Sequence, residues 1–201
     1  MVLTEQQHDA LTELINIAFS RTAASLSELT AQRVLLDAPQ VEVRPIGELS
    51  DTLASQMEDQ NVATVHQPFA GPMVGDAFLL LGYNDALMLT SLLTDAPSIT
   101  IDRLDTSARE VLIEVGNILL NSCLGMFGNL LHMHITFAVP RLHLQALNAL
   151  LDSIVITGRR DYALIVYTSF RLRDSAVSGY LVIVLGVASL ESLIVAIEEL
   201  G

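Results

Sequence analysis

Two stretches of the chain share one pattern: LTELINIAFSRTAASLSELT at residues 11–30 and LIEVGNILLNSCLGMFGNLL at residues 112–131. Each is an apolar, helix-like run that contains a glutamate followed three residues later by an asparagine. The pairs are Glu13 with Asn16 and Glu114 with Asn117, so a shift of 101 positions superimposes one stretch on the other. This repetition predicts that the chain arose by internal duplication.

The same shift aligns residues beyond these helices. Pro39 falls on Pro140, and four apolar residues after the first proline fall on four after the second. These are Val41, Val43, Ile46 and Leu49, matched by Leu142, Leu144, Leu147 and Leu150. We therefore expect one domain made of two repeats, at about residues 5–95 and 105–200. The segment TDAPSITIDRLD, residues 94–105, carries several turn formers and is the expected joint.

Each half is expected to contain the same series of elements. The pattern predicts long helices at 5–30 and 105–132, proline-containing strands at 33–45 and 134–144, and short amphipathic helices at 47–57 and 144–152. Two β-rich runs and a closing helix follow in each half. Strands joined by short turns favour antiparallel pairing. The expected fold class is therefore α+β, a pseudo-twofold arrangement with long helices packed on a largely antiparallel sheet.

Composition excludes several classes of function. The chain has 201 residues, half of them apolar and 16% charged, which indicates a folded globular protein. Its 23 acidic and 10 basic residues give a net charge of -13, which disfavours nucleic acid and anionic membrane surfaces as partners. The chain has no lysine, and this excludes mechanisms that need a Walker or Schiff-base lysine.

The cellular compartment is indicated by three weaker signals. Cys123 is the single cysteine, so no internal disulfide can form, and this favours a reducing compartment. Because Cys123 lies in an apolar run, a buried core role is favoured over a reactive thiol. The N-terminal residues lack the pattern of a signal peptide. Uninterrupted apolar runs fall short of the roughly 20 residues that span a bilayer. We expect a cytoplasmic protein without membrane insertion.

The Glu and Asn pairs are the candidate functional residues. Helical spacing places four polar residues on one face of each long helix. They are Asp9, Glu13, Asn16 and Ser20 in the first half, and Glu110, Glu114, Asn117 and Asn121 in the second. Asparagine is unfavourable within a helix, so its recurrence at both positions favours a function over an ordinary solvated face. An amide can orient a water molecule, and a nearby carboxylate can pair with a cation of a partner.

These residues match a known family. The stretches ELINIAFSRTAASLSEL, VLLDAPQVEVRPIGEL and EVGNIL resemble the CheC, CheX and FliY family of chemotaxis phosphatases. The family signature is an acidic residue or serine, three residues, Glu, two residues, Asn, twenty-two residues and Pro. The chain contains it twice, as Asp9, Glu13, Asn16 and Pro39, and as Glu110, Glu114, Asn117 and Pro140. Two copies make the chain more similar to CheC than to CheX, and the resemblance covers nearly the whole chain.

The resemblance implies a substrate and a mechanism. The substrate would be the phospho-aspartate of a CheY-like receiver domain, a response regulator of two-component signalling. Asn16 and Asn117 would orient the attacking water, while Glu13 and Glu114 would pair with the receiver's lysine. The chain would need no cofactor of its own, because the Mg²⁺ ion would belong to the receiver. A CheD-like deamidase is a further possible partner, since some family members bind one.

The chain departs from the family signature at a few positions, and two other functions remain as alternatives. In the second copy, Glu110 replaces the usual Asp or Ser. In the first copy, Ala18 and Ser20 replace common glycines, and because their added bulk would hinder close approach of the receiver, we expect the first site to be weaker than the second. A non-catalytic receiver-binding or flagellar-switch module is the main alternative. A metal site is the lesser one. It would use His132, His134 and His143, which are more readily read as ordinary histidines.

Overall fold

The computed structural model describes residues 3–57, 60–94, 103–157, 162–172 and 175–199. The helices are α1 (Glu5–Thr30), α2 (Leu49–Gln56), α3 (Tyr83–Thr94), α4 (Thr106–Leu130), α5 (Leu147–Thr157) and α6 (Val187–Glu198), with a 3-10 turn η1 (Ile46–Glu48) before α2. The strands are β1 (Val34–Leu36), β2 (Gln40–Pro45), β3 (Asn61–Ala70), β4 (Gly75–Gly82), β5 (Thr136–Phe137), β6 (Arg141–Ala146), β7 (Tyr162–Leu172) and β8 (Ser175–Leu185). This series matches the predicted one. Most of the predicted joint, residues 95–102, lies outside the described residues.

Two boundaries differ from the prediction. Each proline-containing strand is divided in two, β1 and β2 around Pro39 and β5 and β6 around Pro140. Proline has no N–H group to donate to a ladder, so the pairing is interrupted there. The helix predicted at 144–152 begins only at Leu147, because Leu144 to Ala146 continue the pairing of β6 with β3.

The described strands form one eight-stranded sheet in the order β1-β7-β8-β4-β3-β5, with β2 also pairing β7 and β6 also pairing β3. All of these pairings are antiparallel. Gln40 pairs with Tyr167 and Arg141 pairs with His66, and the equivalent members of the two pairs are 101 residues apart. The proline-containing strands of each half therefore add to the hairpin of the other half. The α+β fold class is confirmed, and this recurrence supports the interpretation as a duplication.

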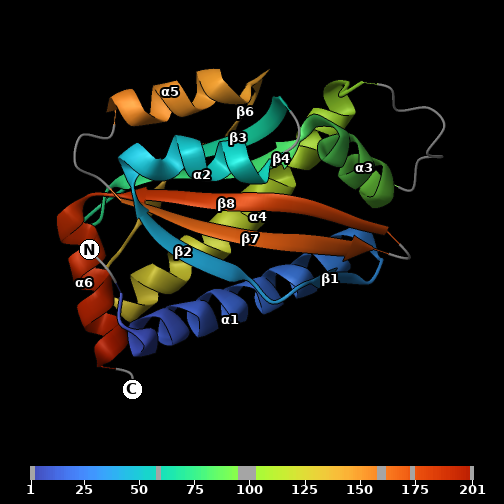
Figure 1. The fold of residues 1–201 in the computed structure, drawn as a ribbon. Coiled ribbons are helices and arrows are strands. Elements are labelled where there is room, and N and C mark those ends of the chain that lie inside the picture. Colours follow the sequence, from blue (N-terminus) through green and yellow to red (C-terminus); the bar gives the residue numbers. More distant parts are fainter. Residues whose placement is uncertain (1–2, 58–59, 95–102, 158–161, 173–174, 200–201) are drawn as a thin grey trace.

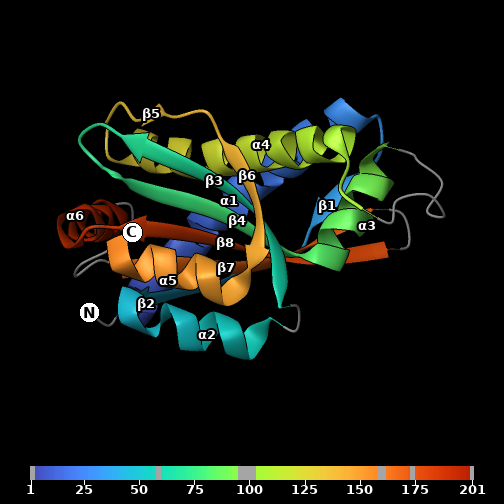
Figure 2. The same cartoon turned by 90° about the horizontal axis from the view of Figure 1, so that it is seen from above.

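Helices cover both faces of the sheet (Figures 1 and 2). On one face, α1 and α4 pack against each other, and α3 and α6 share the same apolar core. On the other face, α2 and α5 cover a smaller core built on residues such as Leu53, Phe78 and Leu151. The two long helices thus keep one side against the sheet and the other available to solvent.

Matching signals begin and end α1 and α4. The hydroxyl of Thr4 accepts a hydrogen bond from the Gln7 N–H, and the carboxylate of Asp105 accepts one from the Ala108 N–H. Such N-caps satisfy N–H groups that have no partner within the helix. Ala31 and His132, just after the two helices, both have a φ of 52°. Because the helices start at equivalent positions, their Glu and Asn residues lie equally far from the caps.

Among the described residues, α4 is the one helix that is both long and apolar enough to span a membrane. Its length and composition would allow it to cross a bilayer, with a mean hydropathy of 1.5 over 18 residues, but 56% of that window is buried within the fold. A core helix of a globular protein passes the same test. Cys123 lies on this helix and is fully buried, as the sequence predicted.

Candidate functional site on two helical faces

The first site lies on the outward face of α1. Leu11, Ile15 and Phe19 are buried and hold the opposite side of the helix against the core. Glu13 is therefore exposed, and Asn16, one turn later, is half-buried. Side chains three apart on a helix have Cβ atoms about 5 to 6 Å from each other, so one partner can contact both.

The second site has the same arrangement on α4. Leu112, Val115 and Leu119 are buried, which leaves Glu114 exposed and Asn117 half-buried. Neither Glu13 nor Glu114 forms an ion pair with any described residue. Both carboxylates are thus available to a cation supplied by another molecule.

The carboxamide of Asn117 is held by two other carboxamides. Its Oδ1 accepts a hydrogen bond from Asn121 Nδ2 at 2.8 Å and a longer one from Gln67 Nε2 at 3.4 Å. Gln67 lies on β3, is 1% exposed, and also donates from Nε2 to the Ala138 carbonyl at 3.1 Å. With Oδ1 occupied in this way, the N–H groups of Asn117 are left for a ligand.

The carboxamide of Asn16 has no such support. Ser20 takes the place of Asn121, and its hydroxyl donates to the backbone carbonyl of Asn16 at 2.9 Å. Thr168 takes the place of Gln67 on β7 and donates to the Asp37 carbonyl at 3.0 Å. Within the described chain, the side chain of Asn16 makes no hydrogen bond. The two sites therefore share residue types but differ in how firmly the amide is held.

The surroundings of the two sites differ in charge. Near the first, Arg171 Nε donates to Asp37 Oδ2 at 2.9 Å. The equivalent positions near the second site are Ala70 and Ala138, and the neighbouring Val139 is 80% exposed. A partner would therefore meet a charged rim at the first site and a more apolar rim at the second.

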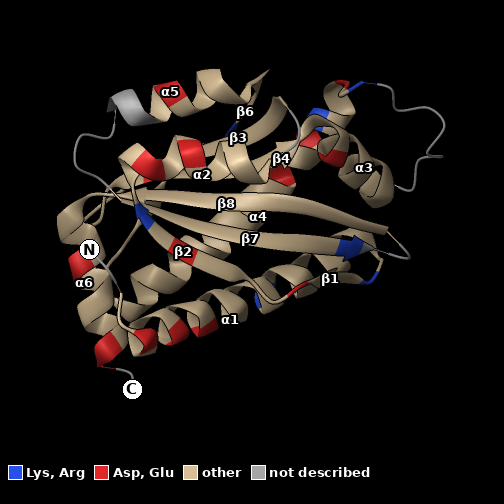
Figure 3. Cartoon of the chain, in the orientation of Figure 1, with Lys and Arg blue, Asp and Glu red and all other residues tan. Residues whose placement is uncertain are grey.

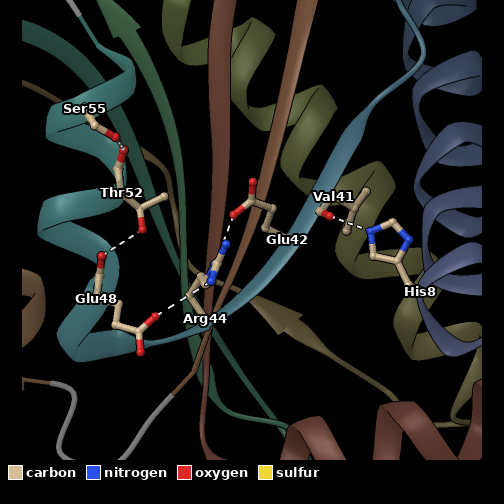
Figure 4. A network of polar contacts seen from close by, with 7 residues as sticks. All are labelled: His8, Val41, Glu42, Arg44, Glu48, Thr52 and Ser55. Atoms are coloured by element: carbon tan, nitrogen blue, oxygen red, sulfur yellow. Dashed lines mark hydrogen bonds and ion pairs between the residues drawn. The ribbon is translucent and has the colours of Figure 1, made fainter. Parts of the chain in front are cut away.

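The N-terminal half of α1 carries several acidic residues along its solvent side (Figure 3). This part of the helix is joined to β2 by His8, whose Nε2 donates to the Val41 carbonyl at 2.8 Å (Figure 4). On the other side of β2, Arg44 Nε donates to Glu42 Oε2 at 3.1 Å, and Arg44 also faces Glu48. The contact of His8 thus ties the start of α1 to β2, while Glu13 forms no ion pair with a described residue.

The Glu and Asn pairs do not line the main hollows of the surface. One hollow of about 310 Å³ lies on the opposite face, lined by residues that include His66, Asp76 and His143. Another of about 650 Å³ lies between the start of α1 and β2. The sites instead lie on open helical surface, which suits docking of a protein more than enclosure of a small molecule.

Three sequence-based expectations can be compared with this geometry. Ala18 is fully buried, so its side chain cannot hinder a partner, whereas Ser20 is exposed. His132, His134 and His143 belong to no metal-binding group, since the described residues contain no cluster of three or more potential ligands. The placement of Mg²⁺ on a partner stays an expectation.

Two supporting residues were missed from the sequence. Val65, Gln67 and Phe69 alternate along β3 and all face the core. A polar residue in this otherwise apolar alternation was the signal that could have identified Gln67. Gly116 precedes Asn117 on a buried helical position, where added side-chain atoms would meet Val65. The sequence shows this glycine, but it does not show that Val65 of β3 lies against it.

Comparison with known proteins gives one sequence relative and several structural neighbours. No family model matches the chain. The CheY-P phosphatase CheC of Bacillus subtilis (strain 168) is 25% identical over 171 residues, which is 83% of this chain and 81% of CheC. FliY of Thermotoga maritima superimposes with a TM-score of 0.77 at 16% identity and covers 99% of both chains.

Two further structures have the same fold. The middle domain of FliM from H. pylori gives a TM-score of 0.65 at 13% identity, covering 96% of this chain and 99% of that domain. The Borrelia burgdorferi CheX–CheY–BeF3–Mg²⁺ complex contains a chain that gives a TM-score of 0.51 at 14% identity, covering 84% of this chain and 96% of that one.

The fold and the paired faces define an α+β protein with an acid and an amide exposed on each of two long helices. Its fold is that of the CheC, CheX and FliY family, and the resemblance seen in the motifs is confirmed by these comparisons.

Proposed function

We propose that this protein is a phosphatase that removes the phosphoryl group from the phospho-aspartate of a CheY-like receiver domain. The observation that carries the proposal is the pairing of an exposed glutamate with a half-buried asparagine on the outward faces of both α1 and α4. The sequence likeness to a CheY-P phosphatase supports the same conclusion.

The chemistry requires positioning more than acid–base catalysis. Water attacks phosphorus while the bond to the aspartyl oxygen breaks, so the carboxylate leaves with the electron pair and the protons of the water remain with phosphate. The transition state of phosphoryl transfer is largely dissociative, which makes a strong base unnecessary. An amide that holds water in line with the breaking bond is then sufficient for a large rate gain.

The residues divide this work. Asn16 and Asn117 each direct a water molecule at phosphorus through their carboxamides. Glu13 and Glu114 pair with a lysine of the receiver and so fix its orientation. The Mg²⁺ ion that neutralises phosphoryl charge belongs to the receiver. The chain acts in the cytoplasm. Its net negative charge favours a partner with a basic docking face. A CheD-like deamidase is a further candidate partner.

The test is the rate of phosphate release from a phosphorylated receiver with Mg²⁺, with and without the purified chain. We expect wild type to accelerate release, and the Asn16→Ala/Asn117→Ala double variant to lose at least about a hundredfold of that acceleration while still binding the receiver. Asn148→Ala, which changes an exposed asparagine on α5 across the sheet, is the matched control and should keep full activity.

The alternative is a non-catalytic receiver-binding or flagellar-switch module. It is favoured by the FliM middle domain, a flagellar protein that shares the fold. Receiver dephosphorylation at its spontaneous rate in the presence of bound wild-type chain would reject the phosphatase and leave this alternative.

The single variants test the expected difference between the two sites. Equal loss of activity in Asn16→Ala and Asn117→Ala would contradict the expected weaker first site.

A further inference from the structure

We propose that Gln67 and Asn121 are positioning residues of the second site, which hold Asn117 with its N–H groups directed at the partner. This inference rests on the proposed phosphatase function and adds to it a chemical difference between the two sites.

The orientation of Asn117 follows from a backbone atom. A carbonyl oxygen can only accept a hydrogen bond, so the atom of Gln67 that lies 3.1 Å from the Ala138 oxygen must be Nε2. The same Nε2 lies 3.4 Å from the end of the Asn117 side chain, which must then present Oδ1. Asn121 Nδ2 reaches that Oδ1 at 2.8 Å. Asn117 therefore keeps only Nδ2 for a ligand.

The burial of this cluster indicates more than a structural role. Gln67 Oε1 and Asn121 Oδ1 are buried and have no hydrogen-bond partner among the described residues. Buried acceptors without partners are unfavourable for folding, and an apolar residue at either position would avoid the cost. The presence of both amides is explained if their N–H groups are needed to donate hydrogen bonds to Asn117 Oδ1.

A close approach between helix and strand makes the contact possible. A Cβ atom on Gly116 would lie 2.6 Å from a methyl carbon of Val65, so only glycine allows α4 to approach β3 at this point. Gln67 follows Val65 on the same face of β3 and so comes within reach of Asn117. The equivalent of Gly116 in α1 is Ile15, a fully buried residue with a bulky side chain where α4 has none.

The consequence for catalysis is a donor-only second site. Asn117 Nδ2 donates to one lone pair of the water oxygen, and the other lone pair faces phosphorus. Because the amide cannot rotate without breaking two hydrogen bonds, the second site holds its water with little loss of side-chain freedom. The first site must order the carboxamide of Asn16 each time a receiver binds.

The test uses residues that the chain itself supplies. Gln67→Thr/Asn121→Ser gives the second site the residues of the first, and Thr168 already shows that a threonine here can donate to the equivalent backbone carbonyl. In an Asn16→Ala background, we expect this pair of changes to lower kcat about tenfold and leave KM for the receiver within about twofold. In an Asn117→Ala background, the same pair should leave the remaining activity unchanged.

Side-chain amide NMR tests the inference without any activity. In wild type, the ¹⁵N relaxation of the Asn117 NH2 group should match that of the rigid backbone, while the Asn16 NH2 group should be mobile. The Gln67→Thr/Asn121→Ser variant should make Asn117 equally mobile. Signals are assigned by their loss in Asn16→Ala and Asn117→Ala.

Two outcomes would overturn the inference: an Asn117 side chain as mobile as Asn16 in wild type, or an equal loss of kcat in the Asn117→Ala background. A rigid Asn117 in a protein that never accelerates phosphate release would instead reject the proposed phosphatase and leave the positioning intact.

Discussion

Asn16 and Asn117 occupy equivalent helical positions and meet different neighbours. The helical period alone predicted their outward placement, because it separates Glu13 and Asn16 from the buried Leu11 and Ile15. Their hydrogen bonds could not be predicted in the same way. Gln67 reaches Asn117 across 50 residues of sequence, and nothing in the local pattern relates the two.

Cys123 gives a prediction at the same scale. Burial raises the pKa of its thiol well above the ordinary value of 9.0, so the proton stays bound in the native state at pH values where the unfolded thiol loses it. This contribution to stability is complete below pH 9 and is lost as the pH rises further. We expect the thiol to resist a disulfide reagent at pH 8 until urea unfolds the chain.

Urea unfolding at pH 8 and pH 10 provides the quantitative check. The free energy of unfolding of wild type should fall more steeply than that of Cys123→Ala, by up to about 1.4 kcal/mol per pH unit above the unfolded pKa. The chain has no lysine, so few other groups titrate in this interval. Equal declines in both proteins, or rapid labelling of the native thiol, would contradict the burial argument.

At the scale of elements, α1 and α4 are similar in length and capping but differ in what they pack against. Helix α4 lies directly against β3 and β4, whereas the main neighbours of α1 are α4, β1 and α6. The order and type of the elements were predictable, because periodicity and turn signals are local. The division of the strands at Pro39 and Pro140, and the depth of α4, depend on pairing between distant segments.

Gly116 offers a test of that depth. Gly116→Ala places a methyl group against Val65, which should lower the free energy of unfolding by about 1 to 3 kcal/mol and weaken the contact between Gln67 and Asn117. Gly125→Ala on the same helix is the control, because a Cβ atom there meets no atom within 4 Å. This change should stabilise the helix by about 0.5 to 1 kcal/mol. Urea denaturation compares them, and equal effects of the two changes would reject the close approach.

At the scale of the whole molecule, the two halves exchange strands. Strand β2 of the first half pairs with β7 of the second, β6 pairs with β3, and β4 pairs with β8 across the centre. The shift in sequence predicted two similar halves in one unit. It contained no signal for the exchange, because either partner hairpin would satisfy the same alternation of apolar residues.

Cleavage between the halves tests this arrangement. A specific protease site placed between Pro97 and Ser98 should give two fragments that elute together near the 21.8 kDa of the uncut chain and separate only in denaturant. The exchanged ladders hold the fragments together after the peptide bond is cut. Fragments that separate in native buffer would show that each half folds alone.

The exchange of strands also affects how the two copies can evolve. Gln67 belongs to the first half, yet its contact is with Asn117 of the second. A hybrid gene that joined one half of this protein to the opposite half of a distant relative would combine mismatched partners at both sites. A mutation in one half therefore also changes the surroundings of the Glu and Asn pair in the other half, and the two copies can diverge only as a coadapted pair.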